Sequence, residues 1–326
     1  MSELRWHPLL GQWVITATER QDRAFFPPKD ICPLCPTKPG AFPTEIPAPS
    51  YDIVVFENKS PSLRRIPPVP AIGPTELEPI RPAEGVCEVV CYTPDHDSTL
   101  AQQPVETIER LVKVWTDRTR VLGARDDVEY VFIFENKGKE IGVTLAHPHG
   151  QIYAYPFIPP TIEIELAQCR EHQLKTGRNL VLEVAESEIA DGRRVIFAND
   201  HFAVYIPFFA RYPYETHIAA RRQGAGRLDQ MTAAEHHELA VTLKRLLVAF
   251  DNLFDMSFPY IMAMHQAPVD GAGYAEIYNF HIEFYPPYRT KDKLKYLAGS
   301  EAGVGAFIND TLAEEKAAEL RAKLPQ

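Results

Sequence analysis

The stretch His147-Pro148-His149-Gly150-Gln151 lies between two apolar segments, at residues 130–134 and 151–155. Because residues i and i+2 of an extended chain face the same way, we expect the two imidazoles on one side of the backbone. Pro148 restricts its own φ, and Gly150 lets a bulky anion approach the backbone. A neutral imidazole is a nucleophile near pH 7. The stretch predicts a reaction at phosphorus, with one histidine as nucleophile and the other as metal ligand or orienting group; the alternative is a surface loop with two histidines.

The composition is that of an ordinary globular protein. The chain has 326 residues, of which 45% are hydrophobic and 24% charged, and its formal net charge is −10. Such a length suits one large or two medium domains. The acidic balance argues against a general nucleic-acid binder, and no apolar run reaches the roughly 18 residues of a membrane span. The N-terminus also lacks the hydrophobic core of a signal peptide, so we expect a cytoplasmic protein without nucleic-acid or membrane partners.

The order of the predicted elements repeats along the chain. Sixteen of the 29 prolines fall within residues 1–82, which predicts extended segments and turns there. Beyond this region, hydrophobic periodicity predicts strand, helix, strand and strand twice over. The first set covers residues 86–92, 104–122, 130–134 and 151–155, and the second covers 217–220, 232–254, 260–264 and 279–285, after a further strand at 202–206.

This repetition predicts an internal duplication. We expect an α+β fold, mostly antiparallel sheet with flanking helices, in which residues 1–190 form an N-terminal unit and residues 191–326 a C-terminal unit. Only the first copy has a second histidine and Gln151, so catalysis is expected there. Capping boxes are predicted at Thr232 with Glu235 and at Thr311 with Glu314, where the last helix should start.

A zinc site is predicted near the pentapeptide. Five cysteines, an odd number, fit reduced thiols better than a disulfide framework. Cys32 and Cys35 have the spacing of one corner of a tetrahedral zinc site, and His96 and His147 are the best candidates for the other two ligands. A structural zinc there would hold the His149 loop rigid, and misplacement of a nucleophile by ~1 Å can cost two orders of magnitude in rate.

A second set of residues mixes imidazole and carboxylate groups. Glu165, His265, His281 and Glu283 are donors that iron, zinc or manganese could use. The alternative is a group of hydrogen-bonded polar residues without an ion. We assign this set no chemical role.

Gln151 discriminates between reaction types. A glutamine amide cannot act as an acid, but it can hydrogen-bond a phosphoryl oxygen as charge develops. It therefore suits a leaving group that needs no proton, such as a sugar 1-phosphate released from a nucleotide sugar. The sequence predicts a ping-pong reaction in which His149 carries the nucleotidyl group.

The chain resembles the galactose-1-phosphate uridylyltransferases of the histidine-triad superfamily. The matching segments are Cys32-Pro33-Leu34-Cys35, Phe56-Glu57-Asn58, Pro94-Asp95-His96, Phe134-Glu135-Asn136-Lys137-Gly138, the pentapeptide, Glu165, His265 and His281-Ile282-Glu283-Phe284-Tyr285-Pro286-Pro287. The resemblance implies two tandem histidine-triad-like units and a homodimer. It also implies a role in galactose metabolism, in which UMP is transferred from UDP-glucose to galactose 1-phosphate. It assigns the first metal set to zinc and the second to iron or zinc, although relatives often have histidine at position 283.

The same resemblance implies contacts with the substrates. These are Arg20 and Arg23 at the diphosphate, Asn58 and Asn136 at nucleotide and phosphate, Thr144 near the phosphates, Lys295 at the sugar phosphate and Glu301 at the sugar hydroxyls. Arg20, Arg23 or residues 295–301 are candidates for groups lent by the neighbouring subunit. Lys59 stands where many relatives have aspartate, and Phe307 lies near the place of a sugar-contacting glutamine.

Two other functions fit the same residues. One is a related adenylyl transferase or phosphorylase, acting on ADP-glucose or a dinucleoside polyphosphate through the same histidine. The other is a zinc-containing nucleotide-binding protein without turnover. The nucleotide left on the protein and the effect of His149→Gly distinguish the three.

Overall fold

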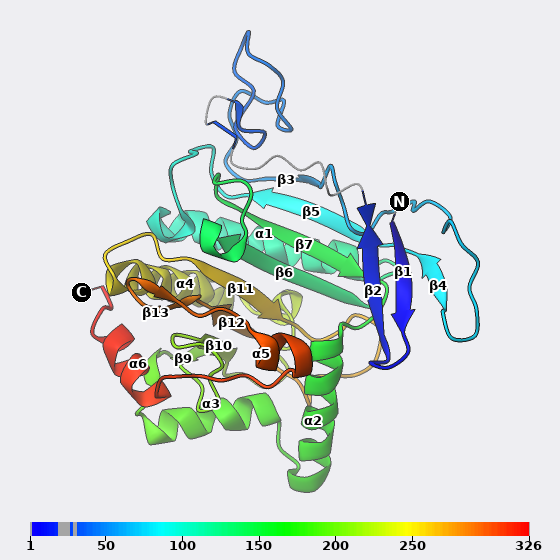
Figure 1. The fold of residues 1–326 in the computed structure, drawn as a ribbon. Coiled ribbons are helices and arrows are strands. Elements are labelled where there is room, and N and C mark those ends of the chain that lie inside the picture. The colour runs from blue at the N-terminus through cyan, green and yellow to red at the C-terminus, as the bar shows by residue number, and fades with distance from the viewer. Residues whose placement is uncertain (1, 19–26, 29–30, 326) are drawn as a thin grey trace.

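The computed structural model describes residues 2–18, 27–28 and 31–325. Its centre is a sheet in the order β3-β5-β7-β6-β11-β12-β10-β9-β8, in which every neighbouring pair is antiparallel (Figure 1). The strands are β3 (Val54–Glu57), β5 (Val86–Cys91), β7 (His149–Tyr155), β6 (Tyr130–Lys137), β11 (Tyr260–His265), β12 (His281–Tyr285), β10 (Thr216–Ala220), β9 (Phe202–Tyr205) and β8 (Val195–Ala198).

The sheet contains two copies of one unit that meet at its centre. The first copy runs β5, α1 (Val105–Gly123), β6 and β7, and the second runs β10, α4 (Ala233–Leu253), β11 and β12. The copies join where β6 pairs with β11, with Asn136 opposite Ile261. This architecture confirms the predicted α+β fold with two tandem units. Strand β6 continues to Lys137, past the predicted end at residue 134, because β11 supplies its last hydrogen-bonding partners.

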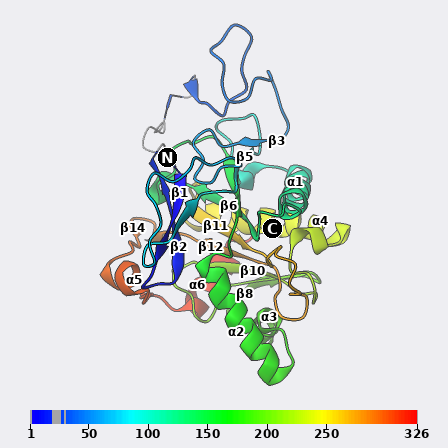
Figure 2. The same ribbon diagram turned by 90° about the vertical axis from the view of Figure 1, so that its right-hand side faces the viewer.

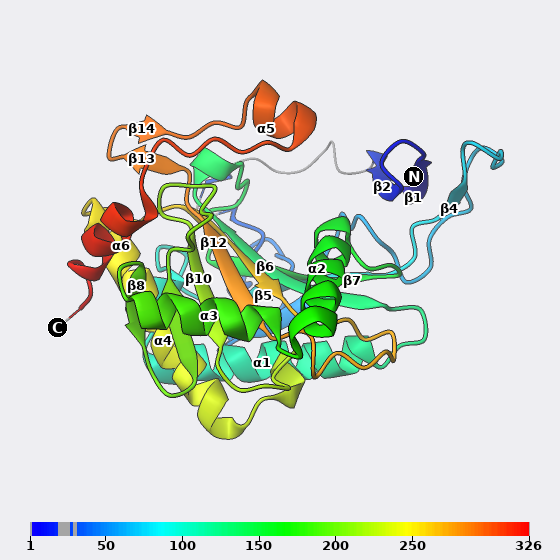
Figure 3. The ribbon, with the colours of Figure 1, turned by 90° about the horizontal axis from the view of Figure 1, so that it is seen from below.

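Helices α1 and α4 cover one face of the sheet, as the view from below shows (Figure 3). The core between these helices and the sheet contains large side chains that are fully buried, such as Trp115, Ile152, Phe250 and Phe284. Each side chain of this size contributes about 1.5–3 kcal/mol by leaving water. Because strand residues alternate between faces, His149 and Gln151 lie on the opposite face from Ile152.

Two helices that the periodicity did not predict lie against the other face of the C-terminal copy. These are α2 (Pro160–Thr176) and α3 (Leu180–Asp191). Helix α3 packs through Ala185 on Ala203 and Ala219 of the sheet. Figure 2 shows both helices toward the opposite end of the sheet from the edge strand β3. This face of the C-terminal copy is therefore covered in part, and a cavity of about 350 Å³ bordered by Arg211, His265 and Tyr285 remains beside α2.

One predicted helix cap is confirmed and the other is wrong. Thr232 Oγ1 accepts from the Glu235 backbone N–H at 3.2 Å, and the Glu235 carboxylate accepts from the Thr232 N–H at 2.6 Å. At the C-terminus, α6 spans Ala313–Arg321 without a side-chain cap. Glu314 cannot cap it because its carboxylate accepts from Arg194 Nη1 at 2.7 Å.

The first quarter of the chain contains strands and loops. Within its described residues there is no α-helix, as its prolines predicted. Strands β1 (Ser2–His7), β2 (Gln12–Ala17) and β4 (Ile80–Pro82) form a small separate sheet, and a loop projects beyond the edge strand β3 (Figure 1). The remaining elements are β13 (Tyr288–Thr290), β14 (Lys293–Leu294), α5 (Gly299–Val304) and 3₁₀ turns at Leu100–Gln102, Lys139–Ile141 and Leu228–Gln230. Among the described residues, no helix has the length and apolar character needed to cross a membrane.

Candidate active site and metal clusters

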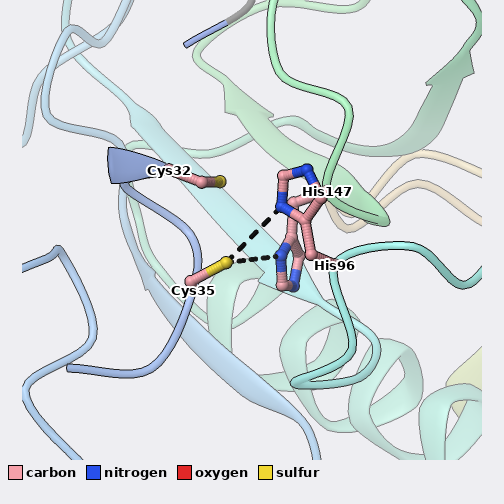
Figure 4. A group of neighbouring side chains, drawn as sticks. All are labelled: Cys32, Cys35, His96 and His147. Atoms are coloured by element: carbon pink, nitrogen blue, oxygen red, sulfur yellow. Dashed lines mark hydrogen bonds between the residues drawn. The ribbon is translucent and has the colours of Figure 1, made fainter. Parts of the chain in front are cut away.

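The four predicted zinc ligands meet at the edge of the N-terminal copy. The ligand atoms of Cys32, Cys35, His96 and His147 all lie within 4.8 Å of one another. Figure 4 shows the side chains pointing toward a common centre. Cys35 Sγ is 3.5 Å from the Nδ1 atoms of both His96 and His147. Two thiols and two imidazoles in this arrangement suit tetrahedral zinc.

The surroundings of His147 also suit a metal ligand. Its Nε2 lies 2.8 Å from the carbonyl oxygen of Thr93 and 2.8 Å from the Tyr51 hydroxyl. Because a carbonyl can only accept, Nε2 carries the proton and Nδ1, which faces Cys35, keeps its lone pair. Burial lowers the pKa of His147 to about 4, so the ring is neutral at pH 7.

His149 is the first residue of β7 and is held in one tautomer. Its Nδ1 lies 2.7 Å from the carbonyl oxygen of His147, so Nδ1 carries the proton and donates it. The lone pair is therefore on Nε2. A backbone carbonyl thus orients the candidate nucleophile, and this carbonyl belongs to the candidate zinc ligand two residues earlier. The candidate metal cluster and the candidate nucleophile thus share one short backbone segment.

Two cavities meet at His149. The first, of about 180 Å³, is bordered by Asn136, His147 and His149, and the second, of about 340 Å³, by Asn58, Thr144, His149 and Gln151. The second cavity has a size typical of small-molecule sites. The predicted contacts Asn58, Asn136 and Thr144 therefore lie around the nucleophile.

Gln151 is oriented by its neighbours. Its Oε1 accepts from Asn58 Nδ2 at 3.3 Å and from the Tyr153 hydroxyl at 3.4 Å. The carboxamide oxygen is thus held by donors, which leaves the NH₂ end to donate elsewhere. This orientation suits a phosphoryl oxygen near His149.

The cavities also contain charged residues to which the sequence analysis gave no contact with substrate. Lys137 and Lys139 border the first cavity, and Glu45 and Lys59 border the second. Lys59 Nζ lies 3.0 Å from Glu45 Oε1. The two lysines of the segment Asn136–Lys139 follow a predicted strand. This position in the sequence could have indicated that they lie near the site. Lys137 Nζ is paired with Asp251 Oδ1 at 3.1 Å, so Lys139 is the lysine of this segment that adds positive charge at the first cavity.

Four predicted substrate contacts are not placed beside His149. Arg20 and Arg23 fall outside the described residues. Lys295 and Glu301 border neither cavity, and their side chains are buried against each other, with Lys295 Nζ 3.3 Å from Glu301 Oε1. Their roles stay predictions.

The second predicted metal set also comes together, on the open face of the C-terminal copy. The ligand atoms of Glu165, His265, His281 and Glu283 lie within 4.8 Å of one another. Glu165 reaches the cluster from α2, where it accepts from His265 Nδ1 at 2.9 Å and from the Tyr278 hydroxyl at 2.6 Å. Burial opposes the charged ring, but Glu165 raises the pKa of His265 to about 9. The donors fit a divalent ion.

An ion-pair network that the sequence reasoning missed adjoins this second set. Arg211 Nη2 lies 2.8 Å from Glu283 Oε2 and 3.1 Å from Glu215 Oε1, and His217 Nε2 lies 3.2 Å from Glu215 Oε1. Glu215, His217 and Glu283 are a further group of metal-type donors. The Arg211 guanidinium already compensates both carboxylates, so this group works as an ion-pair network. No periodicity signals it, because Glu283 and His217 meet only through the pairing of β12 with β10.

The chain is similar to known proteins over its whole length. Residues 1–159 match the family model described as "Galactose-1-phosphate uridyl transferase, N-terminal domain", and residues 165–326 match the corresponding C-terminal domain. A galactose-1-phosphate uridylyltransferase of Thermotoga maritima is 44% identical over 323 residues, which cover 98% of each chain. One of Rattus norvegicus is 33% identical over 342 residues, covering 99% of this chain and 88% of the relative.

Solved structures agree with these matches. A structure titled "Structure of uridylyltransferase" is 34% identical, covers 98% of both chains and superposes with a TM-score of 0.88. An ADP-glucose phosphorylase of Arabidopsis thaliana is 23% identical, with a TM-score of 0.73 over 98% of both chains, and this similarity shows the fold alone. The two family models together span nearly every residue. The chain therefore belongs to the galactose-1-phosphate uridyl transferase family.

Proposed function

We propose that the protein is a galactose-1-phosphate uridylyltransferase, a nucleotidyltransferase of galactose metabolism that moves UMP from UDP-glucose to galactose 1-phosphate. The observation that carries this proposal is the hydrogen bond from His149 Nδ1 to the His147 carbonyl, which leaves a nucleophilic lone pair on Nε2 beside a cavity of about 340 Å³. Membership of the family, and a relative of that name at 44% identity, support the substrates.

The reaction proceeds in two displacements at the same phosphorus. His149 Nε2 forms a bond to the α-phosphorus of UDP-glucose, and the bond from that phosphorus to the bridging oxygen breaks. Glucose 1-phosphate leaves with the electron pair and needs no proton. A phosphate oxygen of galactose 1-phosphate then attacks the uridylyl-histidine, forming UDP-galactose and returning the electron pair to Nε2. The Nδ1 proton stays on the ring throughout.

The surrounding residues stabilise and position these steps. The Gln151 amide donates to a non-bridging oxygen as charge develops, and Asn58, Asn136 and Thr144 contact nucleotide and phosphates. Cys32, Cys35, His96 and His147 would hold a zinc ion whose role is to fix the loop of the nucleophile. Glu165, His265, His281 and Glu283 would hold an iron or zinc ion that stabilises the C-terminal copy.

The proposal extends to the assembly and the compartment. A cytoplasmic homodimer would let Arg20, Arg23, Lys295 or Glu301 act in the neighbouring subunit's site. Each of these charged groups lies either outside the described residues or away from the two cavities at His149. Size measurement in solution, and mixing of subunits that carry different inactivating substitutions, test this arrangement.

Intact-protein mass spectrometry tests the reaction directly. After brief exposure to UDP-glucose alone, the chain should gain the mass of one uridylyl group at His149 and lose it when galactose 1-phosphate is added. A parallel exposure to ADP-glucose should leave the mass unchanged. An adenylyl adduct without a uridylyl adduct would favour the phosphorylase alternative, and no adduct with either nucleotide would leave only a binding protein.

A further inference from the structure

Gly150 separates the nucleophile from Gln151, and the structure explains why no side chain fits there. Its φ lies outside the left-handed region, so backbone conformation does not require glycine. A Cβ at this position would overlap the Tyr92 hydroxyl and lie 3.1 Å from Tyr92 Cζ and 3.0 Å from the Phe134 carbonyl oxygen. Strand alternation points this side of Gly150 away from His149. Gly150 therefore makes room for Tyr92, and the approach of an anion to its backbone stays a prediction.

Tyr92 holds the pentapeptide at two points. Its backbone N–H donates to the Pro148 carbonyl at 3.3 Å, and its hydroxyl lies beneath Gly150. The side chain is 1% exposed, and its ring makes an edge contact with Trp115 at 6.2 Å between centroids. The buried hydroxyl also faces the Glu135 carboxylate, with which it interacts by a side-chain hydrogen bond.

Glu135 and Tyr260 stand behind this hydroxyl. Glu135 is 3% exposed and accepts from the Tyr260 hydroxyl at 3.3 Å. Burial raises the pKa of Glu135 to about 7, and burial with the charge of Glu135 raises the pKa of Tyr92 well above its usual value. The Tyr92 hydroxyl therefore keeps its proton. Tyr260 belongs to β11, so the C-terminal copy supplies one of the side chains near the Tyr92 hydroxyl.

We infer that Tyr92, backed by Glu135 and Tyr260, is a positioning residue that sets the height of the His149–Gln151 segment above the sheet. The Tyr92 hydroxyl contacts the backbone of Gly150. Removal of this hydroxyl lets β7 shift toward the core, and the shift moves His149 Nε2 away from the phosphorus. A shift of a few tenths of an ångström should slow nucleotidyl transfer by about tenfold. This inference rests on the proposed function, because it concerns the placement of the same nucleophile.

A double-mutant cycle tests the contact. The rate constant of uridylyl transfer to His149 is measured in single turnovers for the wild type, Tyr92→Phe, Gly150→Ala and the double variant. We expect Gly150→Ala to slow transfer about 100-fold in the wild type, but about tenfold or less in the Tyr92→Phe background, since the overlap with the hydroxyl is gone. Equal costs of Gly150→Ala in the two backgrounds overturn the inference.

A KM-against-kcat comparison separates positioning from folding. Tyr92→Phe should lower kcat about tenfold while the KM for UDP-glucose and the zinc content stay within about twofold. The matched control is Tyr214→Phe, which removes another buried hydroxyl, bonded to Glu319 at 2.6 Å, and should leave kcat unchanged. If Gly150→Ala does not fold, the comparison of Tyr92→Phe with Tyr214→Phe tests the inference alone. Equal kcat values for these two variants overturn it. Absence of UMP on the wild type overturns the proposed function and this inference together, whereas UMP with an unaffected Tyr92→Phe overturns only the latter.

Discussion

The two copies of the repeated unit place different chemistry at equivalent points of the sheet. In β7, Gln151 lies opposite Phe134, and in β12, His281 lies opposite His265. The N-terminal position opens onto a cavity of about 340 Å³. The C-terminal position is 7% exposed, with Glu165 of α2 as a neighbour. One strand position therefore borders a cavity in the first copy and belongs to a buried polar cluster in the second.

The two copies differ in the segment that precedes the strand. His149 follows a loop that the cluster with Cys32 holds in place, and the face on which His149 lies is accessible. The equivalent residue before β12 is Asn279, which is fully buried and donates to the carbonyls of Ala220 at 3.1 Å and Arg222 at 2.8 Å. The covering helix and the anchoring of the entry segment, rather than the strand register, account for the burial of His281 in the C-terminal copy.

The sharpest test removes one histidine from each copy. His149→Gly should reduce exchange of label between UDP-glucose and glucose 1-phosphate by about 10⁴-fold or more, because the nucleophile itself is lost. His281→Asn should change the exchange rate by no more than about threefold, since this ring lies away from the two cavities. A comparable loss in both variants would mean that the copies do not divide catalysis and structure as described.

The metal clusters should differ in their effect on rate. Cys32→Ser should remove one zinc ion per chain and slow transfer about 100-fold, because the His147 carbonyl would no longer hold His149 in place. Inductively coupled plasma mass spectrometry gives the zinc content beside the rate. Cys169→Ser is the matched control, a buried cysteine outside both clusters, and should keep zinc and rate. Full activity of a zinc-free Cys32→Ser protein would contradict this role.

The seam between the copies should respond to pH. Burial raises the pKa of Glu135 from 4.5 to about 7, so the folded state retains a proton that the unfolded state loses. Its stabilising contribution is full below pH 4.5 and is lost as pH rises through 7. Relative to Glu135→Gln, the wild type should lose about 3 kcal/mol of unfolding free energy between pH 5 and pH 8. Parallel urea-unfolding profiles of the two proteins would show that Glu135 does not titrate this way.

The smallest expected effect concerns the ion pairs of the C-terminal copy. Arg211→Met leaves Glu215 and Glu283 uncompensated and should cost about 2 kcal/mol of unfolding free energy, allowing for the partly exposed guanidinium. Adding Glu283→Gln should recover part of the loss. The control is Arg110→Met, whose exposed pair with Asp52 at 2.8 Å should cost less than about 1 kcal/mol. Equal losses for Arg211→Met and Arg110→Met would show that burial adds nothing to the network.

The hydrophobic pattern predicted the repeated units because each core strand is a short run of mostly apolar residues and each core helix has an apolar face, and both features are local in the sequence. It missed α2 and α3, which bury few residues, and therefore the surface that carries Glu165. The meeting of both metal-type clusters was predicted from donor types and from the resemblance. The continuation of β6 beyond residue 134 was missed because its partner strand lies more than 100 residues away in the chain.

The sequence by itself determined the repeated strands and helices of the core, the order of the two copies and the donor groups near His149, because these depend on local spacing and residue chemistry. Only the tertiary structure decided where α2 and α3 lie, that Arg211 compensates Glu215 and Glu283, and that Tyr92 fills the space beside Gly150. These features arise from contacts between strands that are distant in the chain. Packing against a distant neighbour leaves no period in the sequence, so it becomes visible only when the sheet is assembled.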